Sequence, residues 1–315
     1  MKKIALLLAL LLPILALGAC GKEAAEAISP QDQAAFQAAE AAYETEADPA
    51  VEYLLYETGG RFVALQKGQA LGVYDSREAA LASLFEAPEA YLAVPVPETD
   101  WYICCKDFRG LTYVAFGDSI TYGIDGNFRS GDAAYRMAYP YPTLVGDTLK
   151  LGAVRNEAIS GASFCPHPKR ANMTETILSF FGSADMISLM LGVNDFTSQL
   201  PLGEPGDRDD TTIYGCLHLI SEYLTTMYPD AFVFYMTPFR YVSPDNGVYH
   251  LEDVAQAIKT VAAEYEIPVL DLYEHGRYEL EMGTGDNDGI HPSQQHHRDY
   301  TAPLIAAFVA MNYKR

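Results

Sequence analysis

Apolar residues are arranged in a characteristic way from about residue 110 to the end of the chain. Short, nearly continuous apolar runs alternate with longer stretches in which apolar residues recur at helical spacing. Continuous apolar runs are typical of strands that are buried on both faces. Their alternation with helices predicts a parallel sheet covered by helices on each side. The expected strands are residues 111–116, 154–159, 186–191, 231–236 and 268–272.

Helical spacing follows each of these runs. The expected helices are residues 142–150, 174–181, 211–228, 251–265 and a last one over 294–311. We therefore predict one α/β domain over residues 110–315. Ligands of parallel sheets bind beyond the carboxyl ends of the strands. The long loops 123–138, with Arg129 and Arg136, and 200–210 are therefore candidate rims of a substrate site.

Residues 51–105 have a different texture, with short runs divided by turn residues. Strand-like runs at 51–56 and 61–65 flank a hairpin signal at 57–60, and a third strand is expected at 70–74. A helix capped by Ser76 should follow at 76–85, and then an extended connector with Pro88, Pro95 and Pro97. We predict a small strand-hairpin-helix module that packs on the larger domain, because so few residues bury only a marginal core.

The N-terminus has the pattern of an export signal. Lys2 and Lys3 precede an apolar run at 4–17 that is too short for a membrane span, and Leu17-Gly18-Ala19-Cys20 follows. This tetrapeptide resembles a bacterial lipobox. The resemblance implies a lipoprotein signal peptide at 1–19, lipidation of Cys20, and an extracytoplasmic protein lipid-anchored to the bacterial cell membrane. An ordinary secretory signal with an incidental cysteine is the alternative.

Residues 20–50 are rich in Ala, Glu and Gln, and we predict a solvated tether, with an amphipathic helix as the alternative. The formal net charge of the chain is −21, and removal of residues 1–19 with their two lysines makes it −23. Such an acidic balance argues against nucleic acid as a partner and against charge-driven binding to anionic lipids. It identifies neither a substrate nor an oligomeric state.

Four cysteines remain besides Cys20, namely Cys104, Cys105, Cys165 and Cys216. Export permits disulfides, and four cysteines allow three pairings. A bond between the adjacent Cys104 and Cys105 would be strained, so each should have a distant partner or none. Because no Cys-x-x-Cys spacing occurs, we expect no thiolate metal site and favour buried thiols or one structural disulfide.

Three short stretches, far apart in the chain, carry the residue types of a hydrolytic site. They are Gly117-Asp118-Ser119, Gly192-Val193-Asn194-Asp195 and Asp288-Gly289-Ile290-His291-Pro292. A serine hydroxyl needs a base to take its proton, and the base needs a third group to orient its ring. The middle stretch can supply an amide donor for an oxyanion. Ser119, Gly161 and Asn194 follow the first three expected strands, which places them on one rim of the sheet.

These stretches and a fourth, from Asn156 to Gly161, resemble in order the four sequence blocks of the SGNH hydrolases, also called the GDSL esterase/lipase family. The resemblance covers residues 110–315 and implies a flavodoxin-like three-layer α/β/α sandwich with a parallel five-stranded sheet. It also implies Ser119 as nucleophile, His291 as base and Asp288 as the orienting acid. The oxyanion hole would comprise the amides of Ser119 and Gly161 and the side chain of Asn194.

These residues also have ordinary interpretations. Asp-Ser after a strand is a common helix cap, and Asp286 is a rival to Asp288. We expect His296 and His297 to face water and no metal to be bound, and Asp195 to be structural because its charge would repel an oxyanion. Several rings lie on the predicted rim, and we expect most of them to be core residues: Tyr122, Phe128, Phe164, His167 and Phe196.

The combined prediction is a serine esterase at the cell surface that works through an acyl-enzyme and needs no cofactor. Its substrate is expected to be an O-acetyl group on a carbohydrate, because the chain lacks an apolar lid-like stretch and is expected outside the cell. A lipid acylhydrolase of lysophospholipase type and a non-catalytic glycan-binding surface lipoprotein are the alternatives.

Overall fold

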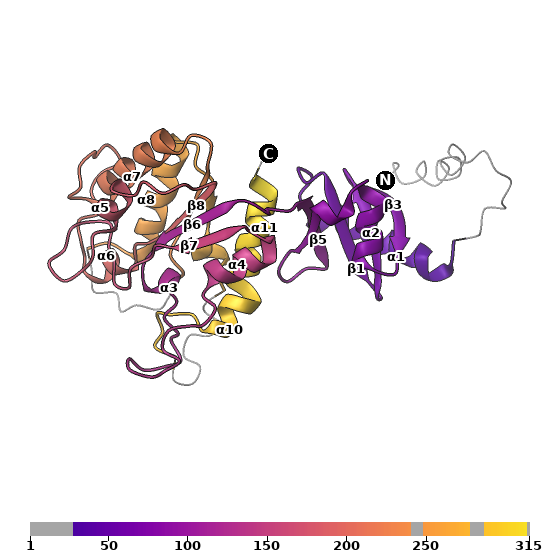
Figure 1. Cartoon of the computed structure of the whole chain (residues 1–315), viewed down its shortest axis with the longest axis horizontal. Coiled ribbons are helices and arrows are strands. Elements are labelled where there is room, and N and C mark those ends of the chain that lie inside the picture. The colour runs from indigo at the N-terminus through magenta and orange to yellow at the C-terminus, as the bar shows by residue number, and fades with distance from the viewer. Residues whose placement is uncertain (1–27, 241–247, 278–286, 314–315) are drawn as a thin grey trace, which may run out of the picture.

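The computed structural model describes residues 28–240, 248–277 and 287–313 (Figure 1). The expected signal peptide, Cys20 and Asp286 lie outside these residues. The described residues form two five-stranded sheets, one parallel and one antiparallel. Helix α11 (Ala302–Asn312) of the parallel domain packs against strands of the antiparallel one.

The parallel sheet has the strand order β10-β9-β8-β6-β7, which is the flavodoxin-like order. It confirms the predicted parallel five-stranded sheet. From β6 the chain crosses to β7 on one side and then returns to β8 on the other, so β6 lies at the topological switch point. The strands are β6 (Thr112–Gly117), β7 (Ala153–Asn156), β8 (Met186–Met190), β9 (Phe232–Met236) and β10 (Val269–Leu270).

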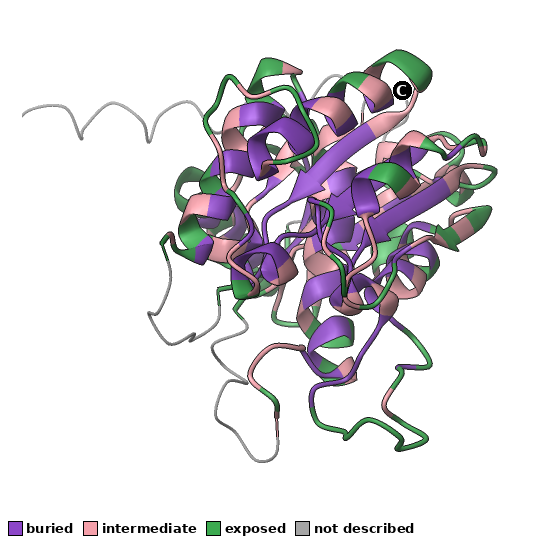
Figure 2. Ribbon diagram, turned by 90° about the vertical axis from the view of Figure 1, so that its left-hand side faces the viewer, coloured by how far each residue is buried: buried purple, intermediate pink, exposed green. Residues whose placement is uncertain are grey.

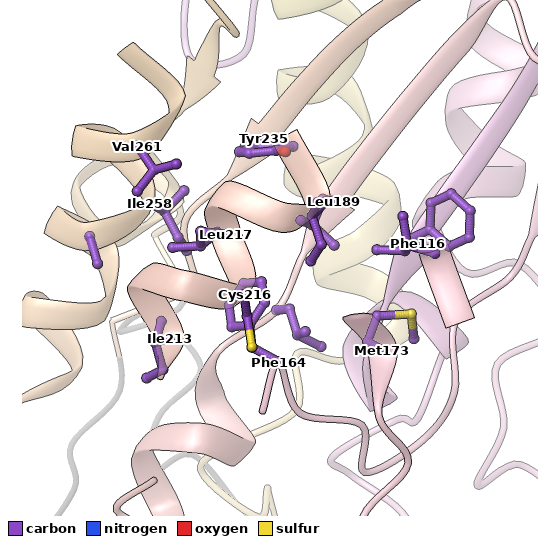
Figure 3. Packing of buried hydrophobic residues seen from close by; sticks show 14 of the residues in the cluster. Phe116, Phe164, Met173, Leu189, Ile213, Cys216, Leu217, Tyr235, Ile258 and Val261 are labelled. Atoms are coloured by element: carbon purple, nitrogen blue, oxygen red, sulfur yellow. The ribbon is translucent and has the colours of Figure 1, made fainter. Parts of the chain in front are cut away.

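Both faces of the three central strands, β6, β8 and β9, are buried, which explains their nearly continuous apolar sequences. Val114 and Phe116 of β6 join the core under α5 (Met173–Leu178), α7 (Ile213–Met227) and α8 (Leu251–Glu264), part of which Figure 3 shows. Tyr113 and Ala115 point the other way, toward α4 (Tyr141–Leu149) and α11. The buried strands pass through the middle of the domain in Figure 2, with exposed loops beyond them.

The C-terminal helix differs from the single helix that was expected. It consists of α10 (Gln294–His296), a π-helical turn η4 (His297–Thr301) and α11. The expectation that His296 and His297 face water is wrong, because both are buried. His297 Nδ1 accepts the Tyr141 N–H at 3.0 Å, and burial lowers the pKa of His297 to about 3. Neutral imidazole is therefore used as a core acceptor.

The antiparallel sheet is larger than the predicted three-strand module. Its order is β3-β2-β1-β5-β4, and the supposed connector forms β4 (Tyr91–Pro95), which pairs with β5 (Trp101–Lys106). Pro95 ends an edge strand, a position that proline tolerates. The prolines of this segment therefore did not exclude a strand, and the predicted connector is wrong here. The other elements are β1 (Tyr53–Thr58), β2 (Arg61–Gln66), β3 (Gln69–Tyr74), α2 (Arg77–Leu84) and the 3₁₀ turn η2 (Pro88–Ala90).

Residues 30–46 form helix α1 (Pro30–Glu46), so the tether prediction is wrong for this stretch and the helix alternative is the observed one. Ser29 caps it, and its buried stripe of Ala35, Ala39 and Ala42 packs on the sheet beside Trp101. Small side chains let the helix lie close to the strands. On the other side, β4 residues share a core with α11, so the module packs on the α/β domain.

The four described cysteines are free thiols and form no disulfide, so of the two alternatives favoured from the sequence, free thiols or one disulfide, the first is observed. Cys104, Cys165 and Cys216 are buried, and the sulfur atoms of Cys165 and Cys216 lie 3.8 Å apart. Among the described residues, no group of His, Cys, Asp and Glu is placed to hold a metal ion. None of the described helices combines the length and apolarity needed to cross a membrane.

Candidate active site

Ser119 is placed by the sharp passage from β6 into the one-turn helix α3 (Ser119–Tyr122). The cap of this helix is Asp118, whose Oδ1 accepts the Ile120 N–H at 3.0 Å, and the Ser119 hydroxyl points elsewhere. Only glycine fits at Gly117, because a Cβ there would lie 2.6 Å from the carbonyl oxygen of Met190. The Gly-Asp-Ser sequence thus builds the passage and presents the serine.

Ser119, His291 and Asp288 form one hydrogen-bonded chain. Ser119 Oγ lies 2.8 Å from His291 Nε2, and His291 Nδ1 lies 2.7 Å from Asp288 Oδ2. The other oxygen of Asp288 accepts the N–H groups of Ile290 and His291, each at 2.9 Å. Partial burial acts to raise the pKa of Asp288, but the hydrogen bonds from His291 and the two amides outweigh it and hold the pKa below its usual range.

The ionised Asp288 fixes the tautomer of His291. A carboxylate only accepts hydrogen bonds, so Nδ1 carries the proton and Nε2 presents its lone pair to the serine hydroxyl. The ring is also mostly shielded, with 15% of the His291 side chain exposed. This arrangement can take a proton from Ser119, which is the chemical requirement for a serine nucleophile.

The loop after α3 holds the Asp-His segment in place. The carbonyl of Gly126 accepts the Asp288 N–H at 2.9 Å, and Asp125 Oδ2 accepts the Gln294 N–H at 3.0 Å. Asp125 is buried, although its Gly-Ile-Asp-Gly setting gives it no sequence signal beyond that of a loop acid. The loop predicted as a substrate rim therefore also forms part of the frame around His291.

Gly161 and Asn194 lie after the next two strands, as expected. Gly161 has φ +80°, a conformation that favours glycine, and a Cβ there would meet no atom within 4 Å. Asn194 lies in helix α6 (Val193–Thr197), and its Nδ2 donates to the Ala162 carbonyl at 2.8 Å. Within the described part of the chain, neither the Ser119 nor the Gly161 amide N–H donates a hydrogen bond. Both are thus available to an incoming oxygen.

Arg170 is the main residue of the site that sequence reasoning missed. Its guanidinium contacts Asn194 Oδ1 at 2.5 Å, and it also reaches the carbonyl of Gly161 at 3.4 Å. In the sequence it is one of a basic pair, Lys169-Arg170, in a loop, which usually denotes a solvated surface. Its partners lie on the loop after β7 and on helix α6 after β8, so only the folded chain brings them to it.

Two acids beside the serine are structural. Asp195 is fully buried and accepts the N–H groups of Phe164 at 3.0 Å and Cys165 at 3.1 Å, as the prediction of a structural role required. Burial raises the pKa of Asp195 to about 7, against the effect of these two donors. Burial likewise raises the pKa of Asp118 to about 6, although the nearby charges of His291 and Arg170 lower it.

The aromatic residues of the predicted rim are buried to different degrees, and the expectation that most of them are core residues is wrong, because only two of the five are buried. Phe164 and Phe196 are core residues, whereas 41% of Phe128 is exposed. Tyr122 is half-buried under the guanidinium of Arg136, which lies 3.8 Å from the ring centre, and His167 is half-buried on its own loop. The loop 200–210 packs over the start of α7, where Pro205 accepts a hydrogen bond from His218.

A serine, histidine and carboxylate joined in this order at the switch point of a parallel sheet are the arrangement found in serine hydrolases. The sequence from residue 115 to 298 matches the model of the GDSL-like lipase/acylhydrolase family. The chain therefore belongs to this family. No curated protein matches the sequence significantly.

Solved structures share the fold of the C-terminal domain. One crystal structure is 25% identical, covers 64% of this chain and 97% of its own, and has a TM-score of 0.57. A Lactobacillus plantarum protein is 24% identical over 66% of this chain and 99% of its own, with a TM-score of 0.55. The Mycobacterium smegmatis aryl esterase is 20% identical over 64% and 98%, with a TM-score of 0.50.

Proposed function

We propose that the protein is a carboxylic ester hydrolase in which Ser119 is the nucleophile. The observation that carries the proposal is the continuous hydrogen-bonded chain from Asp288 through His291 to Ser119. Ser119 Oγ attacks the ester carbonyl while His291 Nε2 takes its proton and passes it to the leaving alcohol. Water then attacks the acyl-enzyme by the same route in reverse. These steps use protein groups and water, and no cofactor enters them.

The tetrahedral intermediate carries a negative oxygen, and three neutral donors are assigned to it. They are the amide N–H groups of Ser119 and Gly161 and the second hydrogen of Asn194 Nδ2, since the first is donated to Ala162. Donors fixed in advance stabilise a developing charge without reorganising. Asp195 is held away from this role by its bonds to two backbone amides.

For the natural substrate we propose an O-acetyl group on a carbohydrate. The rim loop between α3 and α4 is largely exposed and offers Asn127, Arg129 and Asp132 as hydrogen-bonding groups for sugar hydroxyls. The exposed rings of Phe128 and Tyr139 can stack on sugar faces. A lipid acyl ester is the second candidate, favoured by Ile159, which is 37% exposed and bonded through its N–H to Gly117 beside the serine.

The length of the acyl chain separates these candidates. We expect kcat/KM for p-nitrophenyl esters to be highest for acetate and to fall through butyrate to longer chains, and acetate to be released from acetylated xylan. If activity instead rises with acyl-chain length and extends to lysophospholipids, the natural substrate is a lipid ester and the carbohydrate ester is wrong. Glycan binding by both the parent and the Ser119→Ala variant, without hydrolysis by either, would favour the non-catalytic alternative.

The lipid anchor on Cys20 belongs to the same proposal and rests on the sequence pattern alone. We expect the full chain, expressed in a bacterium with lipoprotein export, to incorporate labelled palmitate and to sediment with membranes. A Cys20→Ala variant should lose the label. Equal labelling of both proteins would contradict the anchor, as would the absence of label from both.

A further inference from the structure

We propose that Arg170 is a positioning residue of the oxyanion site, and this rests on the proposed esterase function. The structure assigns two tasks to its guanidinium. It holds the carboxamide of Asn194 in the one orientation that presents an N–H to the substrate, and it joins the loop of Gly161 to the helix of Asn194.

The contacts of Arg170 link two segments that supply oxyanion donors, the loop of Gly161 and helix α6. On α6 and just after it, the guanidinium donates to Asn194 Oδ1 at 2.5 Å, Ser198 Oγ at 2.7 Å and Thr197 Oγ1 at 3.3 Å. On the loop after β7 it donates to the Gly161 carbonyl at 3.4 Å. One planar side chain thus fixes the spacing between the Gly161 loop and α6, and a planar fork of donors is well suited to such a link.

The orientation of the Asn194 amide follows from the chemistry of its two neighbours. A guanidinium has only donors, and the Ala162 carbonyl has only acceptor capacity. The contacts at 2.5 Å and 2.8 Å are therefore both satisfied only when Oδ1 faces Arg170 and Nδ2 faces Ala162. Without Arg170 only the Ala162 carbonyl still selects this orientation, so the carboxamide is held less firmly and its N–H is aimed less well at the substrate oxygen.

The charge of Arg170 adds to this effect. In the described part of the chain it forms no ion pair, and the four atoms that it contacts are neutral oxygens. The side chain is half-buried, so its charge is only partly screened by solvent. A cation so close to the Asn194 carboxamide favours negative charge on the substrate oxygen and polarises the N–H that points to it.

The kinetic test compares variants of the full chain with p-nitrophenyl acetate. We expect Arg170→Ala to lower kcat by about 10- to 100-fold, with KM changed by less than about threefold, because the lost interaction serves the transition state. Arg170→Lys should recover only part of the loss, and added guanidinium ion should rescue the alanine variant. Arg109→Ala is the matched control, since Arg109 is an exposed arginine paired with Asp107 before β6, and it should leave kcat unchanged.

A double-mutant cycle shows whether Arg170 acts through Asn194. Once Asn194 is alanine, Arg170→Ala should cost clearly less than it does in the parent, because only the link to Gly161 and the charge remain to be lost, so the two losses should be non-additive. Additive losses would overturn the proposal, and so would a rise in KM with kcat unchanged, which would make Arg170 a substrate-binding group. A loss of kcat that neither guanidinium ion nor lysine relieves would indicate a merely structural role.

An NMR experiment tests the positioning role of Arg170 directly, even if ester hydrolysis proves independent of Ser119. The side-chain N–H₂ signals of Asn194, assigned in a ¹H–¹⁵N spectrum by their absence from Asn194→Ala, should be two sharp and well-separated peaks in the parent. They should shift, broaden or approach one another in Arg170→Ala while the backbone spectrum persists. Unchanged Asn194 signals in that variant would overturn the positioning role, whereas hydrolysis that survives Ser119→Ala would refute only the proposed function.

Discussion

Replacing Ser119 with alanine is expected to lower kcat for ester hydrolysis by about 10⁴-fold or more. The variant keeps the donors of the oxyanion site but has no oxygen that can form an acyl-enzyme. The protein should remain folded, because the cap of α3 is the Asp118 side chain and not the serine hydroxyl. Steady-state hydrolysis of p-nitrophenyl acetate by the purified protein measures the effect, and a fluorophosphonate probe should label the parent alone.

Ser119 and His291 should behave as one catalytic unit. His291→Ala is expected to lose nearly as much activity as Ser119→Ala, and the double variant little more than either. Ser179→Ala is a matched control and should retain full activity. Ser179 is an exposed serine just after α5 whose hydroxyl donates to the Glu175 carbonyl. Hydrolysis that survives in Ser119→Ala would remove Ser119 from the mechanism, and additive losses in the double variant would show that His291 does not act through Ser119.

Replacing Asn194 with alanine is expected to lower kcat by about 10²- to 10³-fold, which corresponds to a loss of about 3–4 kcal/mol of transition-state stabilisation. The effect should fall on kcat and only slightly on KM, because the donor is aimed at charge that develops during the reaction. Affinity for phenylboronic acid, which adds to a serine hydroxyl as a tetrahedral anion, should fall in parallel.

Asn194→Asp separates the donor role from a structural one. Aspartate is nearly isosteric with asparagine and would form an ion pair with Arg170, so the fold should be retained. It has no N–H and would place a negative charge beside the oxyanion, so its loss of kcat should be at least as large as that of Asn194→Ala. Near-normal turnover in either variant would show that Asn194 is not an oxyanion donor.

The parts of the site that consist of short local sequence patterns could be predicted from the sequence. Gly117 and Ser119 stand at the end of an apolar strand, and Asp288 and His291 are close enough in the chain to contact one another through a single loop. Parallel strands end at one edge of their sheet, so the order of strands and blocks was enough to place Ser119, Gly161 and Asn194 on the same rim. The sheet and its main helices followed from the periodicity alone.

The antiparallel module was harder to predict because its stability is shared. Strand β4 is irregular in sequence and contains Pro95, yet it is stabilised by pairing with β5 and by contact with α11. The alanine-rich α1 has only a weak apolar stripe, so its sequence alone does not show that it packs on the sheet and is stabilised there. Likewise, no local pattern shows that His296 and His297 are buried. His297 accepts the Tyr141 N–H of α4, and His296 Nδ1 lies 3.0 Å from the hydroxyl of Thr301.

The sequence by itself determined the fold class and the rim on which the site lies, because these depend on periodicity, and its resemblance to a known family indicated the residues of the Ser-His-Asp chain. Only the tertiary structure decided what surrounds them. Arg170 meets Asn194, and Asp125 meets Gln294, across long separations in the chain. Such contacts have no local pattern, because each forms only when separate loops are brought together at the edge of a folded sheet.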